Sequence, residues 1–109
     1  MKDFEIPSDL TQESYKIATT ISDLLGDKAS GGGCRAFYSP EEWKKRGEKY
    51  GAESLLILVH DGGELAPYCN HDYEDPMKME IISAALRPLN AYIEQCTSWY
   101  SAVYPIMSA

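Results

Sequence analysis

The residue types that could do chemistry in this chain gather just after its most hydrophobic run. That run, residues 54 to 59, is followed by both histidines of the chain, His60 and His71, and by Cys69. Imidazole nitrogen and thiolate sulfur are the ligands that zinc prefers, and a cysteine beside a histidine is the usual arrangement of a thiol nucleophile. These residues are therefore the candidates for a metal site, completed by Cys34 or Cys96, or for a thiol-dependent enzyme.

The spacing of these groups matches no specific metal or catalytic motif. One residue separates Cys69 from His71, and no paired Cys-x-x-Cys knuckle is present. Cys96 stands in a strand-like pattern, where a buried thiol is common. We favour a buried thiol beside two surface histidines, with no metal, no cofactor and no catalytic residue, and we keep the Cys/His metal-binding or thiol-dependent enzyme as the alternative.

Acidic residues dominate the same part of the chain. Residues 61 to 80 carry six acids and one lysine, and the whole chain has a net charge of −7. The carboxylates are not spaced as in a calcium loop, so a solvated rim is the simpler interpretation. An acidic surface repels phosphate backbones, which argues against direct nucleic-acid binding, and it favours a protein partner with a basic surface.

Aromatic residues suggest where such a partner would bind. The chain has eight tyrosines and two tryptophans, which are the residue types that dominate binding hot spots. Some of them must fill a small core. We expect the others to form a binding surface together with the acidic rim, made of Tyr68, Asn70, Asp72, Tyr73, Glu74, Trp99 and Tyr100.

Length and composition indicate one globular domain over residues 1–109, since 44% of the residues are hydrophobic and 25% are charged. No apolar run is long enough to cross a bilayer, and the start MKDFEIPSD is unlike a secretory signal. Three cysteines at wide spacing cannot form a complete disulfide framework. These features predict a cytoplasmic protein with free thiols and no membrane contact.

Hydrophobic periodicity divides the chain into three parts. A stripe of apolar residues at helical spacing predicts an N-terminal helix over residues 8–26. Residues 27–33 end in three glycines and are read as a Gly-rich linker, because a phosphate-binding loop would follow a strand and carry a lysine. Residues 34–106 then form the core of the domain.

Within that core, capping signals fix two helices. Ser39, Pro40 and Glu42 have the spacing of a capping box, and Gly51 ends this helix; Asp75 and Pro76 open another that runs from Met77 to about Leu89. Between and after the helices, β-rich runs predict strands over 34–38, 54–59, 64–70, 91–96 and 99–104. The second and third of these strands form a hairpin around Asp61-Gly62-Gly63.

The element order predicts an α+β fold. From residue 34 it reads strand, helix, strand, strand, helix, strand, which is the split βαβ arrangement of ferredoxin-like antiparallel sheets. The N-terminal helix and a C-terminal strand are additions to it. Because the terminal strand is rich in tyrosine and tryptophan and would lie at an open edge, a homodimer is a further expectation.

Four segments resemble small uncharacterised bacterial proteins of the kind found on phages and other mobile elements. The resemblance covers about residues 34–106 and rests on SPEEWKKRGEKYG, LLILVHDGG, LAPYCNHDYE and YIEQCTSWYSAVYPI. It brings no catalytic residue to transfer. It implies a small acidic protein that binds and blocks a host protein, such as a component of a bacterial defence system. The predicted function is thus a non-enzymatic protein-binding or regulatory module.

Overall fold

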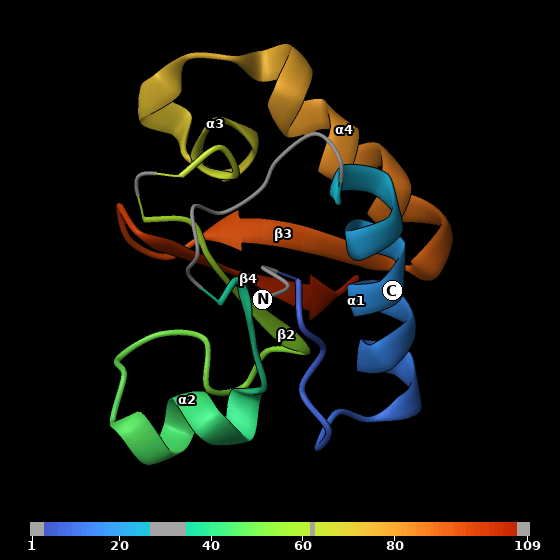
Figure 1. The fold of residues 1–109 in the computed structure, drawn as a ribbon, viewed down its shortest axis with the longest axis vertical. Helices are drawn as coiled ribbons and strands as arrows, with labels where there is room; N and C mark the ends of the chain where they lie inside the picture. Colours follow the sequence, from blue (N-terminus) through green and yellow to red (C-terminus); the bar gives the residue numbers. More distant parts are fainter. Residues whose placement is uncertain (1–3, 27–34, 62, 107–109) are drawn as a thin grey trace.

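The computed structural model describes residues 4–26, 35–61 and 63–106 and has an α+β fold (Figure 1). Its four strands form one antiparallel sheet in the order β1-β2-β4-β3. No helix in these ranges is both long and apolar enough to cross a membrane. The elements are α1 (Gln12–Leu25), β1 (Phe37–Tyr38), α2 (Pro40–Arg46), β2 (Leu56–Val59), α3 (Ala66–Cys69), η1 (His71–Tyr73), α4 (Pro76–Leu86), η2 (Arg87–Leu89), β3 (Ala91–Gln95) and β4 (Tyr100–Pro105).

Strand β2 lies inside the sheet, as its continuous aliphatic sequence predicts. It pairs with β1 on one side and β4 on the other. Leu56 and Leu58 join the larger core cluster, whereas Ile57 joins a smaller cluster around Trp43. Successive side chains of a strand point to opposite faces, so both faces of the sheet are covered at β2.

Helices cover the two faces unequally. The larger cluster contains buried residues of α1, α3 and α4 together with those of the sheet. On the opposite face, α2 is the helix that contributes to the smaller cluster, through Trp43 packed with Ile57, Tyr100 and Ala102. Among the described residues, three helices therefore contribute to the core on one face of the sheet, and the short helix α2 contributes on the other.

Helix α1 is part of the main core. Thr11 caps it by accepting a hydrogen bond of 3.1 Å from the Ser14 amide. Its stripe of Ile17, Ala18, Ile21 and Leu25 is buried in the larger cluster. The predicted helix is confirmed but starts four residues later than expected, and the Gly-rich linker predicted over 27–33 lies outside the described residues.

Helix α2 confirms the predicted capping box and corrects the predicted end. The Ser39 side chain accepts from the Glu42 amide, and the Glu42 carboxylate accepts from the Ser39 amide. The helix ends at Arg46 and not near Gly51, because Gly47 adopts φ of +76° and closes the last turn through its amide. The glycine at residue 51, with φ of +90°, instead marks the turn that leads toward β2.

The strand predicted over residues 64–70 is wrong. This segment forms the short helix α3, in which Pro67 lies in the first turn, where its missing N–H costs no hydrogen bond. Leu65, Tyr68 and Cys69 are buried together, which is the spacing of a helical face and not the alternation of a strand. The predicted hairpin is therefore absent from the described residues, and the strand order does not confirm a ferredoxin-like sheet.

The end of the chain corrects the premise for the predicted homodimer. Asp75 caps α4 as expected, and the two strands that follow it pair as an antiparallel hairpin. The tyrosine-rich β4 nevertheless lies between β2 and β3, so it has no open edge. The edge strand β3 begins at Ala91, which is 1% exposed. Neither observation supports self-pairing through the terminal strand.

Candidate functional site

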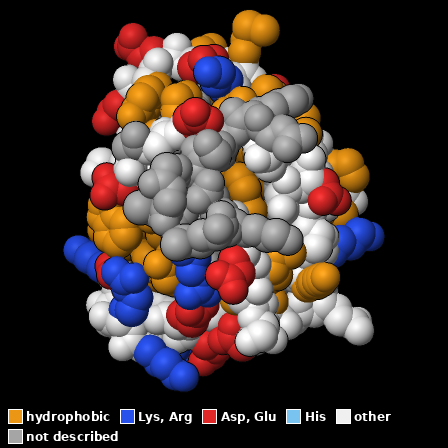
Figure 2. Space-filling view, in the orientation of Figure 1, with side chains coloured by type: hydrophobic (Ala, Val, Ile, Leu, Met, Phe, Trp, Pro, Cys, Tyr) orange, Lys and Arg blue, Asp and Glu red, His pale blue; other side chains and the backbone are white. Residues whose placement is uncertain are grey.

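The candidate site is the turn that joins α3 to α4, which we call the acidic turn and define as His71, Asp72, Tyr73 and Glu74. All four side chains are exposed, and Tyr73 is 48% exposed. The first three residues form η1, and Glu74 ends it in a left-handed conformation with φ of 52°. Acidic side chains are scattered over the end of the molecule where α3 and α4 meet (Figures 1 and 2).

The side chain of buried Asn70 fixes the acidic turn through two hydrogen bonds. Its Oδ1 atom accepts a hydrogen bond of 2.8 Å from the amide of Asp72, which caps η1. Its Nδ2 atom donates at 3.1 Å to the carbonyl of Ser98 in the loop between β3 and β4. The Asn70 side chain, which is 6% exposed, thus joins the turn to the loop between β3 and β4.

Gln95 provides a second attachment at the end of β3. Its Oε1 atom accepts a hydrogen bond of 3.0 Å from the amide of His71, and its Nε2 atom donates at 3.1 Å to the carbonyl of Thr97. The turn is therefore fixed at its first residue and at its centre, while its four side chains stay in solvent.

His60 is a buried structural residue at the same end of the sheet. It is 2% exposed, its Nε2 atom lies 2.9 Å from the Ser101 hydroxyl, and its amide donates to the Trp99 carbonyl at 2.9 Å. Its Nδ1 atom has no hydrogen-bond partner among the described residues. Burial lowers the pKa of His60 to about 4, so the ring is neutral near pH 7.

The two described thiols are poorly suited to nucleophilic chemistry. Cys69 lies in the larger core cluster, where burial raises the pKa of its thiol to about 12. Burial also raises the pKa of the Cys96 thiol, and the negative charge of Glu94 adds to the effect. Both residues are therefore thiols at neutral pH, whereas a cysteine nucleophile needs its thiolate form.

The sequence-derived metal candidates do not converge. His60 and Cys69 are buried, whereas His71 is exposed in the acidic turn. No group of three His, Cys, Asp or Glu side chains in residues 4–26, 35–61 and 63–106 has an arrangement that could hold a metal ion. Cys34 lies outside the described residues.

The other predicted binding residues fall into two groups. Tyr68 and Tyr100 are core residues, at 6% and 1% exposed, and the ring of Tyr100 packs edge-on against Trp43 and Trp99. Trp99 is half-buried. The exposed side chains that sequence reasoning missed include Met77 at 81% and Tyr92 at 42%. Apolar and polar residues alternate around Tyr92, which predicts that one face of the strand points away from the core. The sequence does not tell whether another element covers that face.

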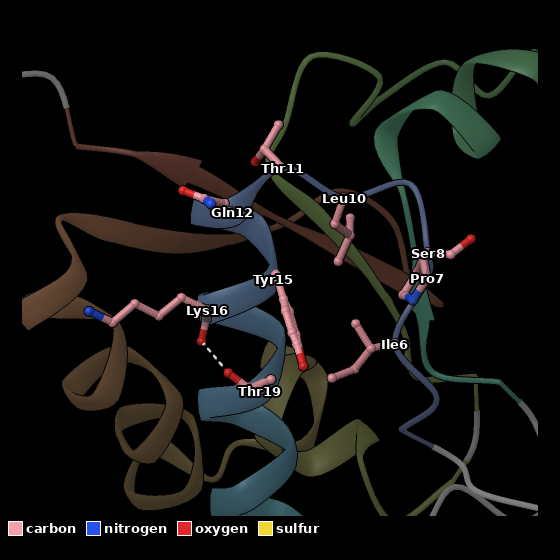
Figure 3. A pocket seen from close by; sticks show the side chains of 9 residues that line it. All are labelled: Ile6, Pro7, Ser8, Leu10, Thr11, Gln12, Tyr15, Lys16 and Thr19. Carbon is pink, nitrogen blue, oxygen red and sulfur yellow. Dashed lines mark hydrogen bonds between the residues drawn. The ribbon is translucent and has the colours of Figure 1, made fainter.

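A shallow hollow of about 680 Å³ lies elsewhere, between the N-terminal segment and α1 (Figure 3). Ile6 and Leu10 of the segment and Tyr15 of the helix form its walls, and the Lys16 side chain extends away from it. The described lining contains no histidine, cysteine or carboxylate.

Comparison of the chain with protein-family models, with curated proteins and with solved structures finds no match.

Proposed function

We propose that this chain is a small non-enzymatic protein-binding module that presents the acidic turn to a basic surface of a partner protein. The observation that carries the proposal is the combination of solvent-facing side chains with a backbone held by Asn70 and Gln95. A binding loop that is already ordered loses less conformational freedom when it binds, so more of its contact energy appears as affinity.

The chemistry of the turn suits a basic partner. Asp72 and Glu74 flank Tyr73, whose ring can fill a pocket while its hydroxyl reaches a polar group. Negative charges at the rim speed association with a positive surface and make it sensitive to salt. We therefore expect the ring of Tyr73 to insert into the partner while the neighbouring carboxylates attract its positive charges.

The biological role that we propose is inhibition of a host protein. The resemblance to small proteins of phages and other mobile elements is the basis for this step. A module without a catalytic group would act by occupying its target in a fixed stoichiometry. A component of a bacterial defence system is the kind of target we propose.

Capture from cell lysate tests the proposal. The full chain is immobilised, and proteins retained from a lysate of the organism that carries the gene are identified by mass spectrometry. We expect a protein with a basic surface to be retained by the wild type, to be lost at high salt and to be depleted by Tyr73→Ala.

The matched control is Tyr15→Ala, because Tyr15 has the same exposed fraction of 48% but lies on α1. This control should retain the partner at the wild-type level. Equal retention by Tyr73→Ala and by the wild type, or catalytic turnover without a stable complex, would count against the proposal.

A further inference from the structure

The face of the sheet that carries α2 is only partly covered. Helix α2 has seven residues, a length of about 10 Å, whereas four strands span about 14 Å between the axes of the outer pair. Its Trp43 packs on Ile57 of β2 and on Tyr100 and Ala102 of β4. The helix therefore covers the middle of the sheet, and Tyr92 of the edge strand β3 remains 42% exposed.

Two tyrosine rings lie together on this open part. Tyr92 and Tyr104 are direct partners in the β3–β4 register, and their rings stack with centroids 5.8 Å apart and an interplanar angle of 29°. Burial raises the pKa of Tyr104 to about 12, so its hydroxyl is neutral. The faces of such rings carry partial negative charge and attract cations.

A carboxylate lies beside the rings on the same face. Glu94 is two residues from Tyr92 in β3, it is exposed, and the residue opposite it in β4 is the small Ala102. Its negative charge contributes to the raised pKa of the Tyr104 hydroxyl. Glu94 takes part in none of the ion pairs found within residues 4–26, 35–61 and 63–106.

We infer that Tyr92, Glu94 and Tyr104, which we name the tyrosine–glutamate patch, form a second docking site, for an arginine side chain of a protein partner. A guanidinium group can stack on the exposed tyrosine face and pair with the carboxylate in the same approach. Charge complementarity decides the occupant, since the patch carries one negative charge on a chain of net charge −7. A phosphate-rich ligand would be repelled by both.

This inference does not rest on the function proposed for the acidic turn. Neighbouring residues of β3 point to opposite faces of the sheet, so Glu94 belongs to the α2 face and Gln95, which holds the turn, to the other. The two surfaces can therefore be disrupted separately.

The test is a titration of the isotope-labelled full chain with a short oligo-arginine peptide, followed by NMR. We expect saturable shifts of the Tyr92, Glu94 and Tyr104 amides. Tyr92→Ala and Glu94→Gln should each weaken binding at these positions roughly five-fold, whereas Tyr92→Phe, which keeps the ring, should bind like the wild type. An oligo-lysine peptide of equal length should bind the patch more weakly, because an ammonium group lacks the planar, forked shape with which a guanidinium stacks on a ring and pairs with a carboxylate.

Two controls separate this inference from general attraction to an acidic protein. Tyr73→Ala should leave the shifts at the patch unchanged, and so should Tyr15→Ala. Shifts confined to residues 71 to 74, or equal affinity in Tyr92→Ala and wild type, would overturn the inference. It would also be overturned if light scattering found a dimer that Tyr92→Ala abolishes, or if a single-stranded oligonucleotide shifted the same amides.

Discussion

The side chain of Gln95 accepts a hydrogen bond of 3.0 Å from the backbone amide of His71, and this bond joins the last residue of β3 to the first residue of the acidic turn. The bond links two residues that are 24 positions apart in the chain. The consequence is a surface turn whose order depends on the sheet, and the binding that we propose for this turn depends on that order.

Replacement of Gln95 by alanine should loosen the acidic turn. The loss of a net hydrogen bond should lower the free energy of unfolding by about 1 kcal/mol. Amide exchange at His71 should become faster, and partner affinity should fall even though no contacting side chain has changed. Chemical denaturation and hydrogen exchange measure the two effects. Gln12→Ala, at an exposed glutamine of α1, is the control and should change neither.

Asn70→Ala should have a larger effect, because Asn70 is buried and serves both the Asp72 amide and the Ser98 carbonyl. The loss of these two hydrogen bonds, at about 1 kcal/mol each, should lower the free energy of unfolding by about 2 kcal/mol. The η1 turn should lose its order, which NMR would detect as sharper and shifted signals for residues 71 to 74. Unchanged stability and signals would show that the turn does not depend on this side chain.

His60 makes stability depend on pH below neutrality. Burial lowers the folded-state pKa from 6.5 to about 4, so the unfolded chain binds more protons between these values. The free energy of unfolding is therefore not reduced by His60 above pH 6.5, and it decreases as the pH falls toward 4. The total decrease in the free energy of unfolding should approach about 3 kcal/mol.

Denaturation curves recorded at several pH values, for the wild type and for His60→Gln, measure this contribution. The variant should lose most of the pH dependence between 6.5 and 4. His71→Gln, at the exposed histidine, should keep it. Identical slopes for wild type and His60→Gln would mean that other groups cause the acid sensitivity.

Two glycines with positive φ should differ in their tolerance of alanine. A Cβ atom at Gly51 would lie 2.6 Å from Cδ1 of the buried Ile57, whereas one at Gly47 meets nothing within 4 Å. Both replacements strain the backbone by about 1 kcal/mol, and only Gly51→Ala also displaces a packed side chain, for a total of about 2 to 3 kcal/mol. Thermal melts of the two variants would contradict this if Gly47→Ala were the less stable.

The parts of the fold that were predictable from sequence are those fixed by local chemistry. The capping box at Ser39 and Glu42 and the cap at Asp75 are bonds between neighbours in the chain, so their spacing identifies both helix starts. The aliphatic run of β2 likewise requires cover on both faces. These signals placed α2, α4 and β2.

Tertiary contacts decided the rest. Residues 65–69 are apolar and contain Pro67, which fits an edge strand or a first helical turn equally well by sequence. Packing of Leu65, Tyr68 and Cys69 in the larger cluster selects the helix. The position of β4 inside the sheet is equally non-local, and it determines that Tyr100 is core while Tyr92 is surface.

For the candidate site, sequence indicated which residues follow the hydrophobic strand but not which of them remain in solvent. Asp72, Tyr73 and Glu74 are exposed in the turn between α3 and α4. His60, one residue after β2, is buried, and its ring forms a hydrogen bond with Ser101 of the neighbouring strand. Such a bond spans 41 residues and leaves no local signal.

The most direct test of the central claim is the dissociation constant of the captured partner for the wild type, Tyr73→Ala and Tyr15→Ala, measured by isothermal titration calorimetry at low and high salt. The account predicts a complex of fixed stoichiometry that Tyr73→Ala weakens at least ten-fold, a cost of about 1.4 kcal/mol, that salt weakens further, and that Tyr15→Ala leaves intact. Equal constants for all three proteins, at both salt concentrations, would contradict it.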